Sequence, residues 1–295
     1  MELNAPPEAA GERLDLFLAG PLGSRTRAQR LIDDGRVLVD GVAKPKRHRL
    51  TGGETIAIED HEPAEAAADD LDVPFAIVFE DEHLLVVDKP AGVVVHPARG
   101  HHSGTLAQAL EARGAAGGEA GRAGIVHRLD KDTSGLLVVA RSDAVHRALK
   151  EAIQARTVTR EYLALVTGRP PARAGTIDAP LGRDRRERTR MSSDTDTPRQ
   201  AVTHFEIAEA LPAATLLRVR LETGRTHQIR AHLQAIGHPV AGDPEYGTAG
   251  DLGLTRQFLH AARLAFEHPV TGVRVELESP LPADLAEALS RARRG

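Results

Sequence analysis

Residues 125–140 constrain the fold more than any other stretch of this chain. The second half, Leu136–Ala140, is a short apolar run with β-branched residues that follows Gly135, and such a run is typical of a buried strand. The first half, His127–Ser134, is almost entirely polar or charged. A polar loop that leads into a buried strand holds its side chains on a rigid scaffold. We therefore expect a functional group in this loop.

Asp130 lies in the middle of the polar loop. Arg128 and Lys131 flank it, and neighbouring cations favour the ionised form of a carboxylate. An aspartate in a turn more commonly caps the backbone or forms an Asx-turn. The loop alone leaves both roles open, the catalytic and the structural.

Length and composition narrow the class of protein. A chain of 295 residues can form one to three domains. It has no apolar run long enough to cross a bilayer, its first residues lack the layout of a secretory signal, and it has no cysteine, so we expect a cytoplasmic protein with no membrane partner. The net charge is −4, and a surface that binds RNA must therefore be a local patch.

Residues 11–60 are predicted to form a small basic module. The apolar spacing and the break signals indicate helices over 12–19 and 25–34, followed by strands over 37–39 and 54–59. Few acids oppose the basic residues of the second helix and the hairpin. A solvated surface is the ordinary explanation for such residues, but their concentration favours contacts with phosphates. The residues we expect to bind RNA here are Arg25, Arg27, Arg30, Lys44, Lys46 and Arg47.

The rest of the chain is predicted to be one larger domain. Residues 1–10 are rich in Pro, Ala and Glu and are expected to fray, and residues 61–72 read as a flexible acidic linker. Residues 73–295 follow as the second domain. Strands and helices alternate irregularly in it, with several hairpins. This pattern favours an α+β fold with a mixed, mainly antiparallel β-sheet and helices outside it.

Two segments of the second domain carry further expectations. Residues 175–180 are predicted to be a short connector. Five arginines then crowd residues 183–190, opposed only by Asp184 and Glu187, and a polar segment follows; we expect a mobile basic loop with no packed element. Further along, Thr226 is the predicted N-cap of a helix.

Metal and nucleotide cofactors find no support in the sequence. His227 and His232 are five residues apart, whereas a zinc-binding helix needs two histidines four apart with a Glu between them. The chain contains no Gly-x-Gly-x-x-Gly, no P-loop and no Gly-x-Ser-x-Gly. We expect no metal and no cofactor.

Several motifs, taken in order, resemble the RluA family of pseudouridine synthases. The first sixty residues are similar to an S4 RNA-binding domain, with Arg-Val-Leu-Val-Asp-Gly at 36–41. The similarity continues through Lys-Pro-Ala-Gly at 89–92, His-Arg-Leu-Asp at 127–130 with the strand that follows, Arg-Glu-Tyr at 160–162, Thr-Gly-Arg-Thr-His-Gln-Ile-Arg at 223–230 and Leu-His-Ala at 259–261. Within the family, the chain is most similar to the D type, which modifies large-subunit ribosomal RNA.

The resemblance implies a fold, a reaction and a set of site residues. The second domain would have the pseudouridine synthase fold and would isomerise uridines in RNA without a cofactor. Asp130 would be the catalytic residue, Tyr162 would lie beside the target uracil, and Arg230 would pair with Asp130. The residues that would hold the RNA are Arg128, Arg185, Arg186, Arg188, Arg225 and His227.

Three alternatives stay open at this point. The substrate could be transfer RNA, or an assembly intermediate of the large ribosomal subunit. The protein could be an RNA-binding or ribosome-assembly factor without activity, although such a protein would have lost Asp130, Tyr162 or Arg230, and none of these is replaced. A glycosidase acting on nucleosides needs a second acid, for which Asp132 is the only nearby candidate. We expect a monomer.

Overall fold

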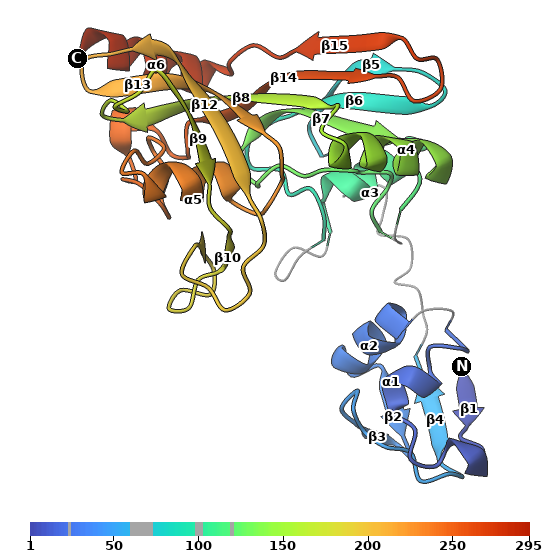
Figure 1. The fold of residues 1–295 in the computed structure, drawn as a ribbon. Helices are drawn as coiled ribbons and strands as arrows, with labels where there is room; N and C mark the ends of the chain where they lie inside the picture. The colour runs from blue at the N-terminus through green and yellow to red at the C-terminus, as the bar shows by residue number, and fades with distance from the viewer. Residues whose placement is uncertain (23–24, 60–72, 98–102, 119–120) are drawn as a thin grey trace. The chain divides into compact units, whose positions relative to one another are not determined.

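The structure divides into two compact units, Met1–Ala68 and Asp69–Gly295 (Figure 1). It is a computed structural model that describes residues 1–22, 25–59, 73–97, 103–118 and 121–295. The predicted acidic linker, residues 61–72, lies outside the described residues. The side chains of Arg25, Arg27 and Arg30 also lie outside them, so the expected RNA contacts of these three residues stay predictions.

The first unit packs two helices against a four-stranded antiparallel sheet of order β1-β4-β2-β3. Leu14, Leu31 and Ile56 are among its buried core residues. A tight turn follows the strand at 37–39: Asp40 and Gly41 both have positive φ, 49° and 76°, as a tight hairpin requires. The elements are β1 (Glu2–Asn4), α1 (Leu14–Phe17), α2 (Arg25–Asp33), β2 (Val37–Val39), β3 (Val42–Ala43) and β4 (Thr55–Ile58).

The N-terminal residues are ordered, contrary to our expectation. Strand β1 pairs with β4, with Leu3 opposite Ile56, and the Ala5 amide donates to the Glu54 carbonyl at 2.9 Å. Ala5 and Ala9 are buried in the core of this unit. The prediction of a frayed end was wrong because three residues with one apolar side chain give no periodic signal, whereas the exposed edge of β4 supplies the missing partner.

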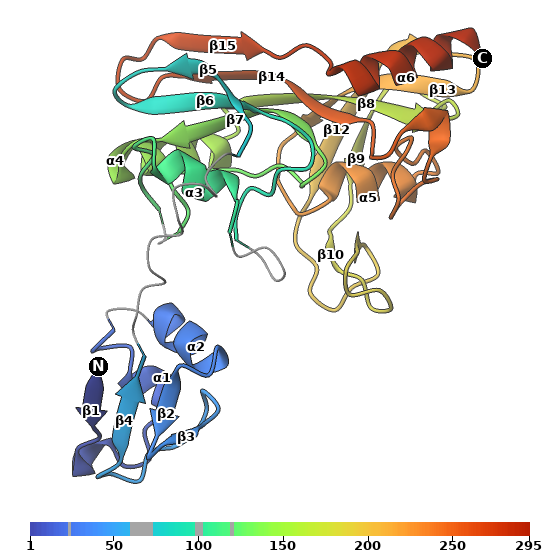
Figure 2. The ribbon, with the colours of Figure 1, turned by 180° about the vertical axis from the view of Figure 1, so that it is seen from behind.

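The second unit is built on a nine-stranded sheet of order β5-β6-β7-β14-β8-β13-β12-β9, with β15 paired to β14. All pairs are antiparallel except β7 with β14, so the predicted α+β class with a mixed, mainly antiparallel sheet is confirmed. The C-terminal helix α6 lies over the β12–β13 end of the sheet (Figure 2), where Arg293 pairs with Glu209 at 2.7 Å. The strands and helices are β5 (Ala76–Glu80), β6 (Leu84–Lys89), α3 (Leu106–Glu111), β7 (Ser134–Ala140), α4 (Asp143–Gln154), β8 (Thr159–Thr167), β9 (Ala174–Asp178), β10 (Gly182–Arg183), β11 (Met191–Ser192), β12 (Val202–Ala210), β13 (Ala214–Leu221), α5 (Gln228–Ala235), β14 (Leu259–Glu267), β15 (Arg274–Glu278) and α6 (Ala283–Arg294).

Strand β7 is buried along its whole length, as its apolar run predicts. Its side chains alternate between two cores: Leu137 and Val139 lie in the core that contains Leu106 of α3, while Leu136 and Val138 lie in the core that contains Leu149 of α4. Both faces of the strand are therefore covered. The polar loop that precedes β7 therefore ends in a strand that is buried on both faces.

Two segments differ from the sequence predictions. The expected connector at 175–180 contains most of strand β9, which pairs with β12 through Ile177 and Thr203. A glycine at the second position of this edge strand weakens the strand signal in the sequence. The second segment is the basic one.

The basic segment at 183–190 begins in strand β10 and continues as the loop that leads to β11, so the predicted loop is flanked by a strand pair that the sequence analysis did not predict. Strand β10 pairs with β11, and Arg185 forms ion pairs with Asp194 at 3.2 Å and Asp196 at 2.9 Å. These two acids come from the polar segment that follows the arginines, and the sequence prediction did not count them as opposing charges. The mobility of this hairpin stays a prediction.

Candidate active site

The loop that carries Asp130 is held by hydrogen bonds to its backbone. The Lys131 carbonyl accepts from Lys89 Nζ and from the Gly92 amide, both at 2.9 Å, and the Asp132 carbonyl accepts from Arg256 Nη1 at 3.0 Å. Where the loop enters β7, Gly135 has φ 115°, and a Cβ there would lie 2.3 Å from the Ala261 carbonyl oxygen. Only glycine allows β7 and β14 to approach this closely. The position of Asp130 is therefore set by neighbouring strands and not by the loop alone.

Lys89 is an internal anchor for this loop. Its side chain is fully buried, and Nζ donates to the carbonyls of Pro90 at 2.8 Å, Val93 at 3.1 Å and Lys131 at 2.9 Å. Burial lowers the pKa of Lys89 to about 7, although the negative charges of Asp132 and Asp130 oppose this shift. The Lys-Pro-Ala-Gly motif at 89–92 thus has a structural role, because its lysine makes the hydrogen bonds that hold the loop.

Arg230 of helix α5 joins Asp130 to two other acids. Its Nε and Nη2 donate to the two oxygens of Asp243 at 2.6 and 2.8 Å, and Nη2 also donates to Glu245 Oε2 at 2.7 Å. Its Nη1 donates to Asp130 Oδ2 at a longer 3.4 Å. The predicted pairing of Arg230 with Asp130 is present in the structure, but the bidentate partner is Asp243.

The charges around Arg230 are strongly coupled. Burial disfavours the cation, but the hydrogen bonds and charge of Asp243 outweigh burial and raise the pKa of Arg230. For Asp243, burial raises the pKa, but the hydrogen bonds and charge of Arg230 lower it further, so the net pKa falls. Both groups are therefore charged at neutral pH.

Sequence analysis missed Asp243 and Glu245. Asp243 is fully buried, and its Oδ1 also accepts from the backbone amides of Glu245 and Tyr246 at 2.9 and 3.0 Å. The available signal was the segment Asp-Pro-Glu-Tyr after Gly242, which reads as an ordinary Asx-turn. Nothing local indicates that this turn packs against an arginine thirteen residues earlier.

Tyr162 lies on β8, which the sheet places between β14 and β13. Its side chain is 4 % exposed, and within the described part of the chain its hydroxyl has no hydrogen-bond partner. Burial raises the pKa of Tyr162, and the charge of Asp130 adds to the shift while Arg160 opposes it. The phenol is therefore protonated at neutral pH.

Helix α5 begins later than predicted. Its N-cap is His227, in the left-handed region with φ 54°, and not Thr226. The turn before the helix is closed by Gln228, whose Oε1 accepts from the Arg225 amide at 3.0 Å and from Thr223 Oγ1 at 2.8 Å. Because His227 is in the left-handed region, it cannot be the first helical residue after a Thr226 cap, and the first helical turn starts at Gln228.

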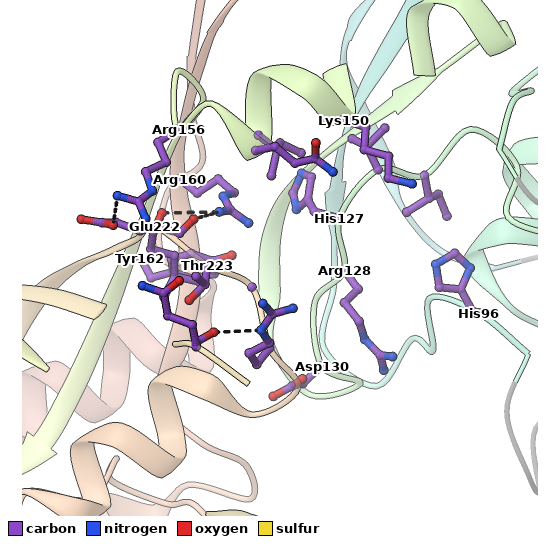
Figure 3. Close-up of a pocket in the computed structure, with 18 of the residues that line it drawn as sticks. His96, His127, Arg128, Asp130, Lys150, Arg156, Arg160, Tyr162, Glu222 and Thr223 are labelled. Atoms are coloured by element: carbon purple, nitrogen blue, oxygen red, sulfur yellow. Dashed lines mark hydrogen bonds and ion pairs between the residues drawn. The ribbon is translucent and has the colours of Figure 1, made fainter. Parts of the chain in front are cut away.

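One small cavity brings together six of the predicted site residues. It has a volume of about 40 Å³, and its walls include Arg128, Asp130, Tyr162, Arg225, His227 and Arg230. A second cavity of about 490 Å³ shares Asp130, Tyr162, Arg128 and Arg225 with the first (Figure 3). Asp130 and Tyr162 therefore face a common space that is large enough for a substrate.

The other predicted RNA-binding residues lie elsewhere. Arg185, Arg186 and Arg188 belong to the β10–β11 hairpin and do not line either cavity. The hairpin is tied to the site through Tyr246, whose hydroxyl accepts from the Met191 amide at 2.7 Å and lies 3.1 Å from His227 Nδ1. The remaining three, Lys44, Lys46 and Arg47, lie in the first unit, where Lys46 pairs with Asp33 at 2.9 Å.

The site combines a carboxylate, a buried tyrosine and several arginines around one cavity. Such a site suits an enzyme that acts on a polyanion by carboxylate chemistry. In the described residues, no three acids or histidines are arranged to hold a metal ion, and no helix is long and apolar enough to span a membrane.

Comparison with known proteins identifies the family to which this chain belongs. Residues 83–235 match the RNA pseudouridylate synthase family model, and residues 12–56 match the S4 domain. An uncharacterized RNA pseudouridine synthase of Bacillus subtilis is 44 % identical over 301 residues, covering 100 % of this chain and 98 % of that protein. The ribosomal large subunit pseudouridine synthase D of Nitrosomonas europaea is 46 % identical over 308 residues, covering 99 % of this chain and 88 % of that protein.

A solved structure agrees with the sequence matches. Human RNA Pseudouridylate Synthase Domain Containing 1 superposes with a TM-score of 0.57 and 30 % identity, covering 71 % of this chain and 84 % of that one. The chain belongs to the RNA pseudouridylate synthase family and carries an S4 domain. It is therefore an RNA pseudouridine synthase, and the resemblance seen in its motifs is confirmed.

Proposed function

We propose that the enzyme isomerises uridines of large-subunit ribosomal RNA and that Asp130 is its catalytic residue. The observation that carries the assignment of Asp130 is its place in the wall of the cavity, beside Tyr162 and 3.4 Å from Arg230. The names of several relatives, which are ribosomal large subunit pseudouridine synthases, support the choice of RNA.

In the proposed reaction Asp130 breaks the glycosidic bond of a bound uridine. It attacks C1′ of the ribose or C6 of the base, or it abstracts a ribose proton to give a glycal. The bond between N1 and C1′ breaks, the uracil turns in the cavity, and C5 bonds to C1′. The proton on C5 leaves and N1 gains one, so the product is an isomer and no oxidant or cofactor takes part.

Tyr162 and Arg230 support this chemistry in different ways. Tyr162 offers an aromatic face on which a base can stack, and its raised pKa keeps the phenol protonated, which suits contact with the base better than removal of a proton. Arg230 fixes the direction of the Asp130 side chain through Nη1.

The basic residues would hold the RNA around this centre. Arg128 and Arg225 line the cavity and can contact the distorted strand around a uridine that has left its stack. The S4 module, within residues 11–60, and the β10–β11 hairpin supply further phosphate contacts. Residues 73–295 form the catalytic domain, and the enzyme acts as a monomer in the cytoplasm.

The alternatives differ in what they require of the site. A nucleoside glycosidase needs a second acid beside Asp130. Asp132 does not line either cavity, and Glu222, which lines the larger one, is already paired with Arg156. A transfer RNA substrate, or a role in ribosome assembly without catalysis, requires no second acid in the cavity. Carbodiimide mapping of RNA from a deletion strain distinguishes these, because it shows whether ribosomal RNA, transfer RNA or neither loses pseudouridine.

The test of Asp130 is an isosteric substitution. Asp130→Asn keeps the shape of the side chain but is neither anionic nor basic, so tritium release from RNA labelled at uridine C5 should fall to background. RNA binding should persist, because phosphate contacts elsewhere supply the affinity. Asp132→Asn, two residues away and outside the cavity, is the matched control and should keep most of the activity. Native tritium release by folded, RNA-bound Asp130→Asn protein would refute the assignment.

A further inference from the structure

The 490 Å³ cavity extends beyond Asp130 and Tyr162 to a basic end that the proposed reaction does not use. The residues there include His127, Lys150, Arg156 and Arg160 (Figure 3). Around the whole cavity the cations outnumber the anions, because Asp130 and Glu222 face Arg122, Arg128, Lys150, Arg156, Arg160 and Arg225. This end therefore suits an anionic part of the substrate.

Arg160 is the central group of this basic end. It precedes Tyr162 by two residues on β8, so both side chains are on the same face of the strand, about 7 Å apart along it. Only 6 % of the residue is exposed, and it forms no ion pair within the described part of the chain. Its Nη2 makes two long contacts, at 3.4 and 3.5 Å, with the carbonyls of Leu221 and Glu222, and its buried Nε has no partner there.

His127 adds a second unsatisfied donor. Its Nε2 accepts from the Val138 amide at 3.2 Å, so the proton of the neutral ring is on Nδ1. Nδ1 is buried and has no partner among the described residues. Burial, with the charge of Arg160, lowers the pKa of His127 to about 3, so the ring is a neutral donor at physiological pH. Buried donors without acceptors are costly unless a ligand completes them.

Gly224 leaves room for the guanidinium of Arg160. A Cβ at this position would lie 3.0 Å from Arg160 Nη1, and the backbone of Gly224 does not require glycine for its own conformation. Arg156 lies beside the same strand end, where it pairs with Glu222. Glu222 is thus already paired, and no acid of the described residues forms an ion pair with Arg160.

We propose that this end of the cavity is a subsite for an RNA phosphodiester flanking the target uridine, with Arg160 and His127 as its donors. The proposal rests on the proposed function, because it places the base at Tyr162 and the ribose at Asp130. A phosphodiester would supply a negative charge to pair with the guanidinium of Arg160. Its oxygens would also accept hydrogen bonds from Arg160 Nε and His127 Nδ1. A base carbonyl would supply an acceptor without the charge.

The test is phosphate ethylation, which removes the charge of one phosphodiester at a time. Total RNA from a strain lacking the enzyme is lightly ethylated and incubated with enzyme, and isomerised molecules are separated and mapped at the modified uridine. With the native enzyme, ethylation of one flanking phosphate should reduce isomerisation about tenfold or more. With Arg160→Gln, the rate on intact RNA should fall by a similar factor, and ethylation at that phosphate should have no further effect.

Two further variants complete the experiment. Arg160→Lys should restore part of the sensitivity, because it keeps the charge and loses the fork. Arg293→Gln, at a surface arginine of α6 that lines neither cavity of the site, should give the native pattern. If Arg160→Gln does not fold, Gly224→Ala serves instead, since its methyl group must shift the guanidinium of Arg160 by a few tenths of an ångström and should weaken the same interference.

The outcomes separate the two proposals. If the native enzyme isomerises no uridine of this RNA, the proposed function fails. If it isomerises a uridine but no flanking phosphate is sensitive, the subsite is wrong. The subsite is also wrong if Arg160→Gln, or Gly224→Ala in its place, retains the full sensitivity at that phosphate.

Discussion

Replacing Asp243 by asparagine should strongly destabilise the second unit, although Asp243 lines neither cavity. Asp243 is fully buried and accepts two hydrogen bonds from Arg230 and two from backbone amides. Asparagine preserves the shape and one acceptor oxygen. Its NH₂ group, however, would face either Arg230 Nε or the donors at the other oxygen, and the negative charge is lost.

The size of the effect follows from the burial of the pair. Removing one partner of a buried ion pair costs about 3–5 kcal/mol, and asparagine falls near the lower limit because part of the hydrogen bonding survives. For a unit of this size, about 3 kcal/mol corresponds to a fall in the melting temperature of roughly 10 °C. Arg230 would also lose its main anchor, so tritium release should fall as well.

Glu245→Gln is the matched control, because Glu245 binds the same guanidinium from a more exposed position. Its side chain is 35 % exposed and makes one bond to Arg230, at 2.7 Å. We expect a loss below about 1 kcal/mol. Thermal unfolding of the full chain, followed by circular dichroism at neutral pH, compares the three proteins. Equal melting temperatures for the two variants would refute the argument from burial.

The pH dependence provides an independent check. Because the folded pKa of Asp243 lies below its unfolded value of about 3.9, its contribution is complete above that pH and is lost as the pH falls through the folded pKa. The native protein and Asp243→Asn should therefore converge in stability only in strong acid. A difference that disappears already at pH 6 would contradict this assignment.

Two further predictions concern the first unit and Lys89. Deleting residues 1–60 should weaken binding to long RNA, while turnover at saturating RNA survives. The slope of log affinity against log salt concentration should fall by about one for each phosphate that the module neutralises. Unchanged RNA affinity would count against an RNA-binding role. Burial lowers the pKa of Lys89 to about 7, whereas the pKa in the unfolded chain is about 10. Between pH 7 and about pH 10 the unfolded chain therefore binds more protons than the folded one. The stability of the native protein relative to Lys89→Met should rise over this pH range. Urea midpoints at pH 7.5 and 9.5 measure this, and a constant difference would show that Lys89 does not titrate.

The features that the sequence predicts well depend on short segments. The apolar run at 136–140 is buried on both faces, and the motifs around Asp130, Tyr162 and Arg230 meet at one cavity. Each of these has a local pattern: a continuous apolar run, a polar loop with its flanking charges, or a short motif such as Arg-Glu-Tyr at 160–162. Their order along the chain is what indicates that they belong to one site.

The features that the sequence does not predict depend on contacts between distant segments. The carboxylate of Asp243 looks like a turn residue until the fold packs it against Arg230, and Asp194 and Asp196 oppose Arg185 only once β10 and β11 pair. Arg160 had a usable signal, because period-two alternation places it on the same face as Tyr162. That it has no acidic partner among the described residues is visible only in three dimensions.

The arrangement around Arg230 explains why Asp130 has the longest of its ionic contacts. A guanidinium has five N–H donors, and here Nε and Nη2 are directed to Asp243 and Glu245 at 2.6–2.8 Å, while Nη1 is directed to Asp130 at 3.4 Å. Asp243 and Glu245 orient the guanidinium, so its orientation does not depend on a short bond to Asp130. A carboxylate held by two short bonds would have its lone pairs occupied and its basicity lowered. The longer single contact directs Asp130 into the cavity and leaves oxygen lone pairs available for the proposed reaction with a uridine.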